Sequence, residues 1–327
     1  MSRILLFAGN GLDIHLGLGT SYPDFYAWLI RKHPDFAWLD AIESEPQGWS
    51  DLELALGIYS RELNHTGEYL RQKREVENYL SEFLQEQSGQ FCPDSQRLQL
   101  YRKILRNDLL TFWKALPPGE SDFIKERIEN SDPVTYTFLS FNYTDCLDGL
   151  IAGWDDRSLP LSHREKACTD HVAGVYHLHG RLGEPLVLGL DNASQLADQS
   201  LLETGRPELI KKDILEQHQH QFVYGPVEDL LAETFLCLLY GVSLGATDAI
   251  WWKMLALWLE RDASRRLLIY IYRSAEQDAD EQNAFFERRF GVYASEAGVR
   301  WENIRDQVLF VDADRFFCFS FLSSPSF

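Results

Sequence analysis

The sequence is poor in cysteine and in basic residues. It has five cysteines among 327 residues, and none of them forms a Cys-x-x-Cys pair. This spacing disfavours a zinc ribbon, and scattered cysteines are typical of a reduced cytoplasmic protein. Lys and Arg total 31 against 50 Asp and Glu, which gives a formal net charge of −19. A field of that sign repels phosphate backbones, so we do not expect nucleic-acid binding.

Long apolar runs are also missing. No stretch reaches the roughly 18 apolar residues of a membrane helix. The first apolar run, Ile4–Gly9, is too short for the core of a signal peptide. We therefore expect a cytoplasmic protein without membrane contact. The length suggests either about two domains or one large unit with an insertion.

Short apolar runs rich in β-branched and aromatic residues predict buried strands. Helical patterns lie between several of these runs; one example is the apolar stripe within Ile250–Leu259. Strands that alternate with helices predict an open, mostly parallel α/β sheet that binds ligands at the carboxyl ends of its strands. The predicted strands are Ile4–Ala8, Thr135–Phe141, Val172–Leu178, Leu186–Leu188, Phe235–Val242, Leu267–Tyr272 and Val308–Val311.

A long helical segment separates the first two predicted strands. The interval is about 125 residues, against the dozen or so that a crossover needs. Apolar stripes at helical spacing run through Val76–Leu84 and Leu98–Phe112. We therefore expect residues 41–132 to form a helical insertion into an α/β core of residues 1–40 and 133–327. The apolar tail Phe316–Leu322 is either a last strand or a partner-facing surface.

A glycine turn follows the first strand and contains Gly9, Asn10, Gly11 and Asp13. Glycines at such a turn let the backbone approach a ligand and leave N–H groups to bind phosphate oxygens. Any tight turn uses the same residues, so this cluster is weak evidence on its own. The third glycine of the dinucleotide fingerprint is missing, which disfavours a standard dehydrogenase.

Polar residues also follow the second strand, at Asn142 and Thr144. The amide of Asn142 could hold a water or a ribose hydroxyl in the crevice. The alternative is that Asn142 turns the chain and Thr144 caps the next helix.

His177 and His179 stand on one face of a strand, and Gly180 follows. Two imidazoles could share a metal ion, but the sequence places no third ligand nearby. We favour His179 as a general base, because an imidazole titrates near neutral pH. A hydrogen-bonded core histidine is the alternative.

A fourth cluster, Gly241–Asp248, follows a strongly apolar strand. The hydroxyl of Ser243 and free backbone N–H groups at that strand end could face an adenine or a ribose. The alternative is structural, because Thr247 or Asp248 would be an ordinary helix N-cap.

In this order, the motifs Gly-Asn-Gly-x-Asp, Phe-Asn-Tyr-Thr, His-Gly and Gly-x-Ser-Leu-Gly-x-x-Asp resemble those of the bacteriophage abortive-infection family AbiH. The segments Gly19–Phe25 and Trp49–Glu53 look like further signatures of that family. Ser50 with Glu53 also spells a helix capping box, which explains that pair structurally. The resemblance spans Ile4–Trp258.

AbiH proteins look in turn like distant relatives of the sirtuins, whose Rossmann-like sheet binds NAD. The resemblance implies an open, mostly parallel Rossmann-like (sirtuin-like) fold with a helical insertion. It implies that the glycine turn Gly9–Asp13 binds the nucleotide and that Phe25 lies in a turn over its nicotinamide end. Ser243, Leu244 and Asp248 are expected to contact the same ligand.

The resemblance also suggests the catalytic pair. Asn142 matches the asparagine of the sirtuin Asn-x-Asp motif, and His179 matches the histidine of its His-Gly motif. Thr144 stands where the Asp of Asn-x-Asp is expected, which weakens one ribose contact. The zinc-ribbon cysteines are absent, which argues against protein deacetylation.

These features predict an antiphage protein that cleaves the nicotinamide–ribose bond of NAD without a metal. His179 would act as the base, and Asn142 would hold the water or the ribose. The alternative is a sensor or toxin component that binds an NAD- or ADP-ribose-type nucleotide without turnover, and Thr144 is its main support. A purely structural α/β protein is a third interpretation. A phage-derived trigger and a homo-oligomeric partner are left open.

Overall fold

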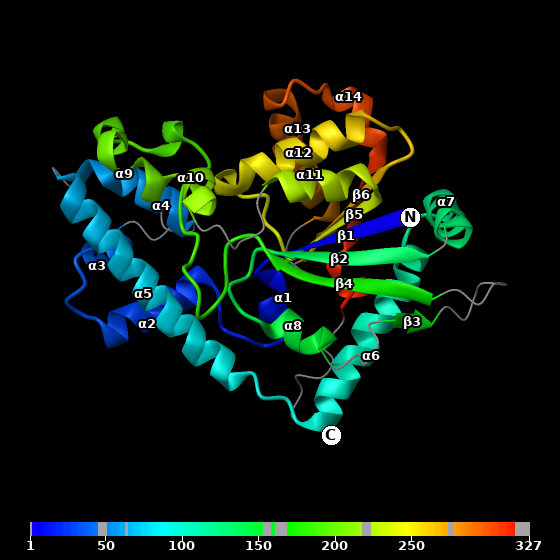
Figure 1. The fold of residues 1–327 in the computed structure, drawn as a ribbon, viewed down its shortest axis with the longest axis horizontal. Coiled ribbons are helices and arrows are strands. Elements are labelled where there is room, and N and C mark those ends of the chain that lie inside the picture. The colour runs from blue at the N-terminus through cyan, green and yellow to red at the C-terminus, as the bar shows by residue number, and fades with distance from the viewer. Residues whose placement is uncertain are drawn as a thin grey trace.

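A seven-stranded sheet runs through the centre of the computed structural model (Figure 1), in the order β3-β4-β2-β1-β5-β6-β7. The strands are β1 Ser2–Ala8, β2 Val134–Ser140, β3 Ser158–Pro160, β4 Thr169–His177, β5 Thr234–Tyr240, β6 Arg266–Ile271 and β7 Val308–Asp312. The structure describes residues 2–44, 51–62, 65–131, 133–152, 158–160, 169–217, 224–273 and 278–317.

Six of these strands are parallel, and only the edge strand β3 runs antiparallel, against β4. Numbered by sequence without β3, the parallel strands lie in the spatial order 3-2-1-4-5-6, which is that of the Rossmann fold. The prediction of an open, mostly parallel α/β sheet is therefore confirmed. The strand order reverses between β1 and β5, where such sheets bind their ligands.

Helices cover both faces of the sheet because alternate strand residues are apolar on both sides. In β1, Ile4, Leu6 and Ala8 pack into one core, while Leu5 and Phe7 pack into the other. The first core is completed by α1 Gly11–His15, α6 Ser95–Thr111, α7 Pro118–Asn130 and α8 Cys146–Ile151. The second is completed by α11 Tyr224–Ala232, α12 Ala249–Glu260, α13 Ala279–Glu296 and α14 Trp301–Ile304.

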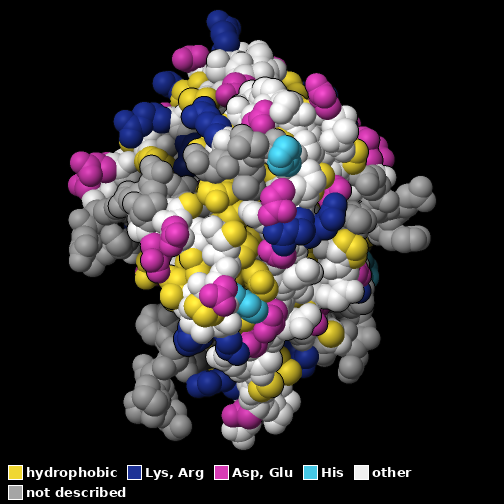
Figure 2. Space-filling model, turned by 90° about the vertical axis from the view of Figure 1, so that its left-hand side faces the viewer, with side chains coloured by type: hydrophobic (Ala, Val, Ile, Leu, Met, Phe, Trp, Pro, Cys, Tyr) yellow, Lys and Arg dark blue, Asp and Glu magenta, His cyan; other side chains and the backbone are white. Residues whose placement is uncertain are grey.

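A separate group of helices, here called the helical layer, lies beyond the carboxyl ends of the strands, on the left of Figure 1. Aromatic residues such as Phe25, Trp28, Trp38 and Phe83 form a core of its own. Figure 2 views this side, where acidic and basic side chains are intermixed and no large basic area is visible. The helices are α2 Tyr22–Lys32, α3 Leu39–Ser44, α4 Leu52–Tyr59, α5 Thr66–Gln90, α9 Leu202–Leu209 and α10 Lys211–Gln217.

The expected insertion, residues 41–132, is predominantly helical in its described part, but its helices belong to two different cores. α3, α4 and α5 belong to the helical layer, together with α2 from before residue 41. The apolar stripe of α6 instead packs against the sheet, as does Ile124 of α7. Among the described residues, no helix is both long and apolar enough to cross a membrane.

Three local predictions need correction. Leu186–Leu188 is buried but forms no strand, because Leu186 and Leu188 pack into the helical layer and not beside another strand. Asp51, and not Ser50, caps α4, since its carboxylate accepts a hydrogen bond from the Leu54 amide; Ser50 lies outside the described residues.

The beginning of the apolar tail is not a strand either. Phe316 and Phe317 are buried against Tyr240 and Tyr270 on one face of the sheet. The rest of the tail, 318–322, lies outside the described residues.

Candidate functional site

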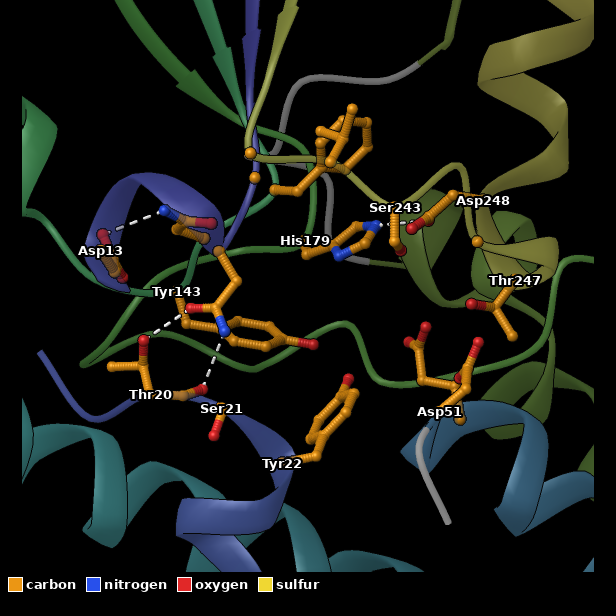
Figure 3. Close-up of a pocket in the computed structure, with 18 of the residues that line it drawn as sticks. Asp13, Thr20, Ser21, Tyr22, Asp51, Tyr143, His179, Ser243, Thr247 and Asp248 are labelled. Atoms are coloured by element: carbon orange, nitrogen blue, oxygen red, sulfur yellow. Dashed lines mark hydrogen bonds and ion pairs between the residues drawn. The ribbon is translucent and has the colours of Figure 1, made fainter. Parts of the chain in front are cut away.

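A pocket of about 370 Å³ opens between the carboxyl ends of the strands and the helical layer (Figure 3). It lies at the reversal point between β1 and β5, and its volume falls within the range of small-molecule sites. Its lining is rich in hydroxyl and carboxylate groups. The polar side chains that line it are Asn10, Asp13, Thr20, Ser21, Tyr22, Asp51, Glu53, Asn142, Tyr143, Thr144, His179, Ser243, Thr247 and Asp248.

The glycine turn allows the ends of β1 and β5 to touch. The Gly9 amide donates to the Tyr240 carbonyl at 2.9 Å, and the Gly11 amide donates to the Gly241 carbonyl at 3.0 Å. A Cβ on Gly11 would lie 2.5 Å from the Cα of Gly241. These two amides are therefore used within the fold, and the nucleotide contact expected of this turn stays a prediction. Gly9 lines the pocket, whereas Gly11 does not.

The side chain of Asn10 forms hydrogen bonds with Thr20, in the segment that leads into α2 of the helical layer. Its side-chain amide donates to the Thr20 carbonyl at 3.0 Å and accepts from the Thr20 hydroxyl at 2.6 Å (Figure 3). Ser21 then caps α2 in a reciprocal capping box with Asp24. The result is that Ser21 and Tyr22, at the start of α2, face the pocket.

Asp13 joins the first and second polar clusters. Asn142 Nδ2 donates to Asp13 Oδ1 at 3.0 Å, and the Thr144 hydroxyl donates to Asp13 Oδ2 at 2.6 Å. Burial raises the pKa of Asp13 to about 6, although both hydrogen bonds oppose the shift. Thr144 therefore bonds across the pocket floor, and the alternative that it caps α8 is wrong, since the N-cap of that helix is Asp145.

His177 contacts the backbone carbonyl of Asn142. Its Nδ1 lies 2.9 Å from the Asn142 carbonyl, and its Nε2 lies 2.9 Å from Asp148 Oδ2. Both partners are acceptors, so both ring nitrogens donate when the imidazole is charged. Burial lowers the pKa of His177, but the bonds to Asp148 and to the Asn142 carbonyl outweigh it and raise the pKa overall.

His179 lies at the opposite side of the pocket and has different partners. It is 6% exposed, and its Nε2 lies 2.9 Å from Asp248 Oδ1. Its second ring nitrogen, Nδ1, faces the pocket (Figure 3). The two histidines thus do not form a pair, and no group of metal-ligating side chains is found among the described residues.

A buried ion-pair cluster lies behind His179, and sequence analysis missed it. Lys211, at the start of α10, places its Nζ 2.7 Å from both Asp248 Oδ1 and Glu53 Oε2. Burial opposes every charge in the cluster. The charge of Lys211 nevertheless holds the pKa of Asp248 below its usual range, and the two carboxylates raise the pKa of Lys211. Burial prevails only at Glu53, whose pKa is raised.

Nothing in the sequence singles out Lys211, because a lysine at a helix start is typical of a solvated surface. Glu53 was assigned to a capping box, but it accepts a hydrogen bond from the Gly189 amide at 3.0 Å. Asp248 is the N-cap of α12, but its side chain makes no capping hydrogen bond. Its carboxylate instead accepts hydrogen bonds from His179 and Lys211.

The structure brings eight of the eleven predicted site residues to the pocket. Phe25 is buried in the aromatic core of the helical layer, against Trp28 and Phe83. Leu244 is buried with a φ of 53°, and its carbonyl accepts a hydrogen bond from the Tyr293 hydroxyl. Gly11 packs on Gly241. The eight are Gly9, Asn10, Asp13, Asn142, Thr144, His179, Ser243 and Asp248.

Fold and site together define a Rossmann-type α/β protein with an acidic, hydroxyl-lined pocket at the reversal point of its sheet. The chain belongs to the bacteriophage abortive infection AbiH family, whose model matches residues 5–270. This membership gives it a role in phage abortive infection. No curated protein matches the chain.

Proposed function

We propose that the chain acts in phage defence as an NAD glycohydrolase, with His179 as the general base. The observation that supports this most directly is the His179–Asp248 pair in the pocket. An ionised carboxylate only accepts hydrogen bonds, so Nε2 carries the proton that Asp248 accepts. In the neutral ring, Nδ1 then keeps its lone pair, and this nitrogen faces the pocket.

The lining of the pocket suits the nicotinamide riboside half of NAD. That half is a cation, and cleavage of its glycosidic bond transfers the positive charge to the ribose ring. Asp13, Asp51 and Asp248 all line the pocket, and their negative charges favour a developing cation. Ser243 and Thr247 supply hydroxyls for the diol of a ribose.

In the proposed reaction, Nδ1 of His179 removes a proton from a water molecule in the pocket. The water oxygen bonds to the anomeric carbon as the carbon–nitrogen bond breaks, and the electron pair of that bond stays on neutral nicotinamide. The products are nicotinamide and ADP-ribose, and the proton remains on His179 until it is released to solvent. Asp248 stabilises the imidazolium that forms.

The test is the release of nicotinamide from NAD by purified protein, with NAD levels in phage-infected cells as a second measurement. His179→Ala should lower turnover about 100- to 10,000-fold while NAD binding persists, because a base acts mainly on the transition state. His171→Ala is the matched control, since His171 is exposed on β4, the strand that leads to His179. Equal rates in the parent and His179→Ala would remove His179 as the base.

A nucleotide sensor without turnover is the second candidate, and one observation favours it. The side-chain amide of Asn142, expected to hold the attacking water, donates to Asp13 in the pocket floor. NAD binding without nicotinamide release, in purified protein and in infected cells, would establish the sensor and exclude the enzyme.

A further inference from the structure

Lys211 is an almost completely buried charge beside the proposed base. It is 2% exposed, and its Nζ lies 3.4 Å from Nε2 of His179 in addition to its two carboxylate partners. Four chain segments meet here. Glu53 comes from α4, Lys211 from α10, His179 from the loop after β4, and Asp248 from the turn before α12.

Burying such a cluster costs free energy. Desolvation of buried ions commonly cancels their attraction, and apolar side chains of similar volume would join two layers of a protein as well. Stability alone is therefore a weak explanation for a cluster in which Lys211 and Glu53 are buried and Asp248 is partly buried. The contact between the cluster and His179 suggests a role in the chemistry of the pocket.

The geometry indicates what Lys211 does to His179. Asp248 Oδ1 accepts from both Lys211 Nζ and His179 Nε2, so the lysine holds this oxygen in the position that receives the imidazole proton. The ammonium has no lone pair and cannot accept from Nε2.

We propose that Lys211 is a positioning residue that keeps Asp248 ionised and turned toward His179, so that His179 stays in the Nε2–H form with Nδ1 free as the base. This inference rests on the proposed function of His179. The charged and titratable groups that face the imidazole are Asp248, Lys211, Glu53 and Tyr143.

The test compares the parent with the double variant Glu53→Gln/Lys211→Met. Removing Lys211 alone would leave Glu53 buried and unpaired, so that single variant is at risk of failing to fold, whereas the double variant removes both charges. The control is Lys212→Met with Glu216→Gln, an exposed pair of the same residue types on α10. Folding of each variant is checked by circular dichroism and thermal unfolding.

The first readout is the ¹⁵N NMR spectrum of the His179 ring, assigned by the signals lost in His179→Gln. The parent should show the Nε2–H tautomer at neutral pH. In the double variant, the population of this tautomer should fall, because Lys211 no longer holds Asp248 Oδ1 toward Nε2. An unchanged tautomer population in a folded double variant would overturn the proposal.

The second readout is steady-state nicotinamide release. We expect kcat to fall about 10- to 100-fold with little change in KM. Full kcat in the folded double variant would also overturn the positioning role. A changed tautomer population in a protein whose parent releases no nicotinamide would instead retain the role of Lys211 and refute the glycohydrolase.

Discussion

The buried carboxyl group of Asp13, in the pocket floor, makes the stability of the protein depend on pH. Burial raises its pKa to about 6 in the folded chain, against 3.8 for a solvated carboxyl group. Between these two values the folded state binds more protons than the unfolded state, so stability falls as pH rises through this interval. A difference of roughly two pH units corresponds to about 3 kcal/mol of stability that is fully present below the unfolded pKa of 3.8 and lost as pH rises through about 6.

Replacing Asp13 should remove this contribution. Urea unfolding of Asp13→Asn and of the parent, measured from pH 4 to pH 7.5, should give curves that converge or cross. The parent should lose up to about 3 kcal/mol relative to the variant as pH rises. Asp229→Asn, at an exposed position on α11, is the control and should follow the parent throughout. Parallel curves for Asp13→Asn and the parent would show that this carboxyl group titrates as in solution.

The pocket residues that directly follow strands could be predicted from the sequence, whereas those contributed by the helical layer could not. His179 and Asp248 could be predicted because the carboxyl ends of parallel strands meet at one edge. Lys211 and Glu53 reach the same point from the helical layer, and only tertiary packing brings them there. The resemblance to a sirtuin turn places Phe25 over the nicotinamide end, but Phe25 lies in α2 and packs into the aromatic core of the helical layer.

Among elements, the contact between the β1 turn and the end of β5 is the tightest constraint described above. A Cβ on Gly11 would lie 2.5 Å from the Cα of Gly241, and both sides of that contact are backbone, so neither can rotate away. We therefore expect Gly11→Ala to lower the free energy of unfolding by about 1–3 kcal/mol or more, as overpacked cores do. NAD binding should weaken only as far as the folded fraction falls, and Gly11→Val should destabilise the fold more.

The control is Gly149→Ala, in the middle of α8, where an added Cβ meets no atom within 4 Å. Its stability should stay unchanged or rise by up to about 1 kcal/mol, because alanine favours the helix. Denaturant unfolding measures both variants. If Gly11→Ala were as stable as the parent but unable to bind NAD, the turn would be a ligand contact and not a packing contact.

Burial on both faces of the sheet explains which strands could be predicted from the sequence. Central parallel strands are buried on both faces, so β1 and β5 stand out as continuous apolar runs. Leu186–Leu188 has the same composition because it is also buried, although it lies under the helical layer. The edge strand β3 is three residues long and carries no such signal. The composition of a segment indicates that it is buried, but it does not indicate whether the segment pairs with a strand. Strand pairing depends on the tertiary structure.

For the whole molecule, alternation of strands and helices predicted the α/β class, but it did not specify the strand order. The reversal between β1 and β5 depends on which strands pair across long stretches of chain, such as β1 with β5, and no local pattern encodes such pairings. Net charge, by contrast, is known from the sequence alone. A charge of −19 acts on any ligand that approaches the pocket.

The negative charge of the protein predicts opposite effects of salt on NAD and on nicotinamide riboside. NAD carries a net negative charge, so the field of the protein slows its approach, and added salt screens that repulsion. We expect kcat/KM for NAD to rise about two- to tenfold between 10 and 150 mM salt. Nicotinamide riboside is a cation, and its affinity as a competing ligand should fall over the same range. Both are measured with the parent protein, in nicotinamide release and in calorimetric binding. Changes of the same sign for both ligands would contradict this account, because a general effect of salt on the fold acts on both alike.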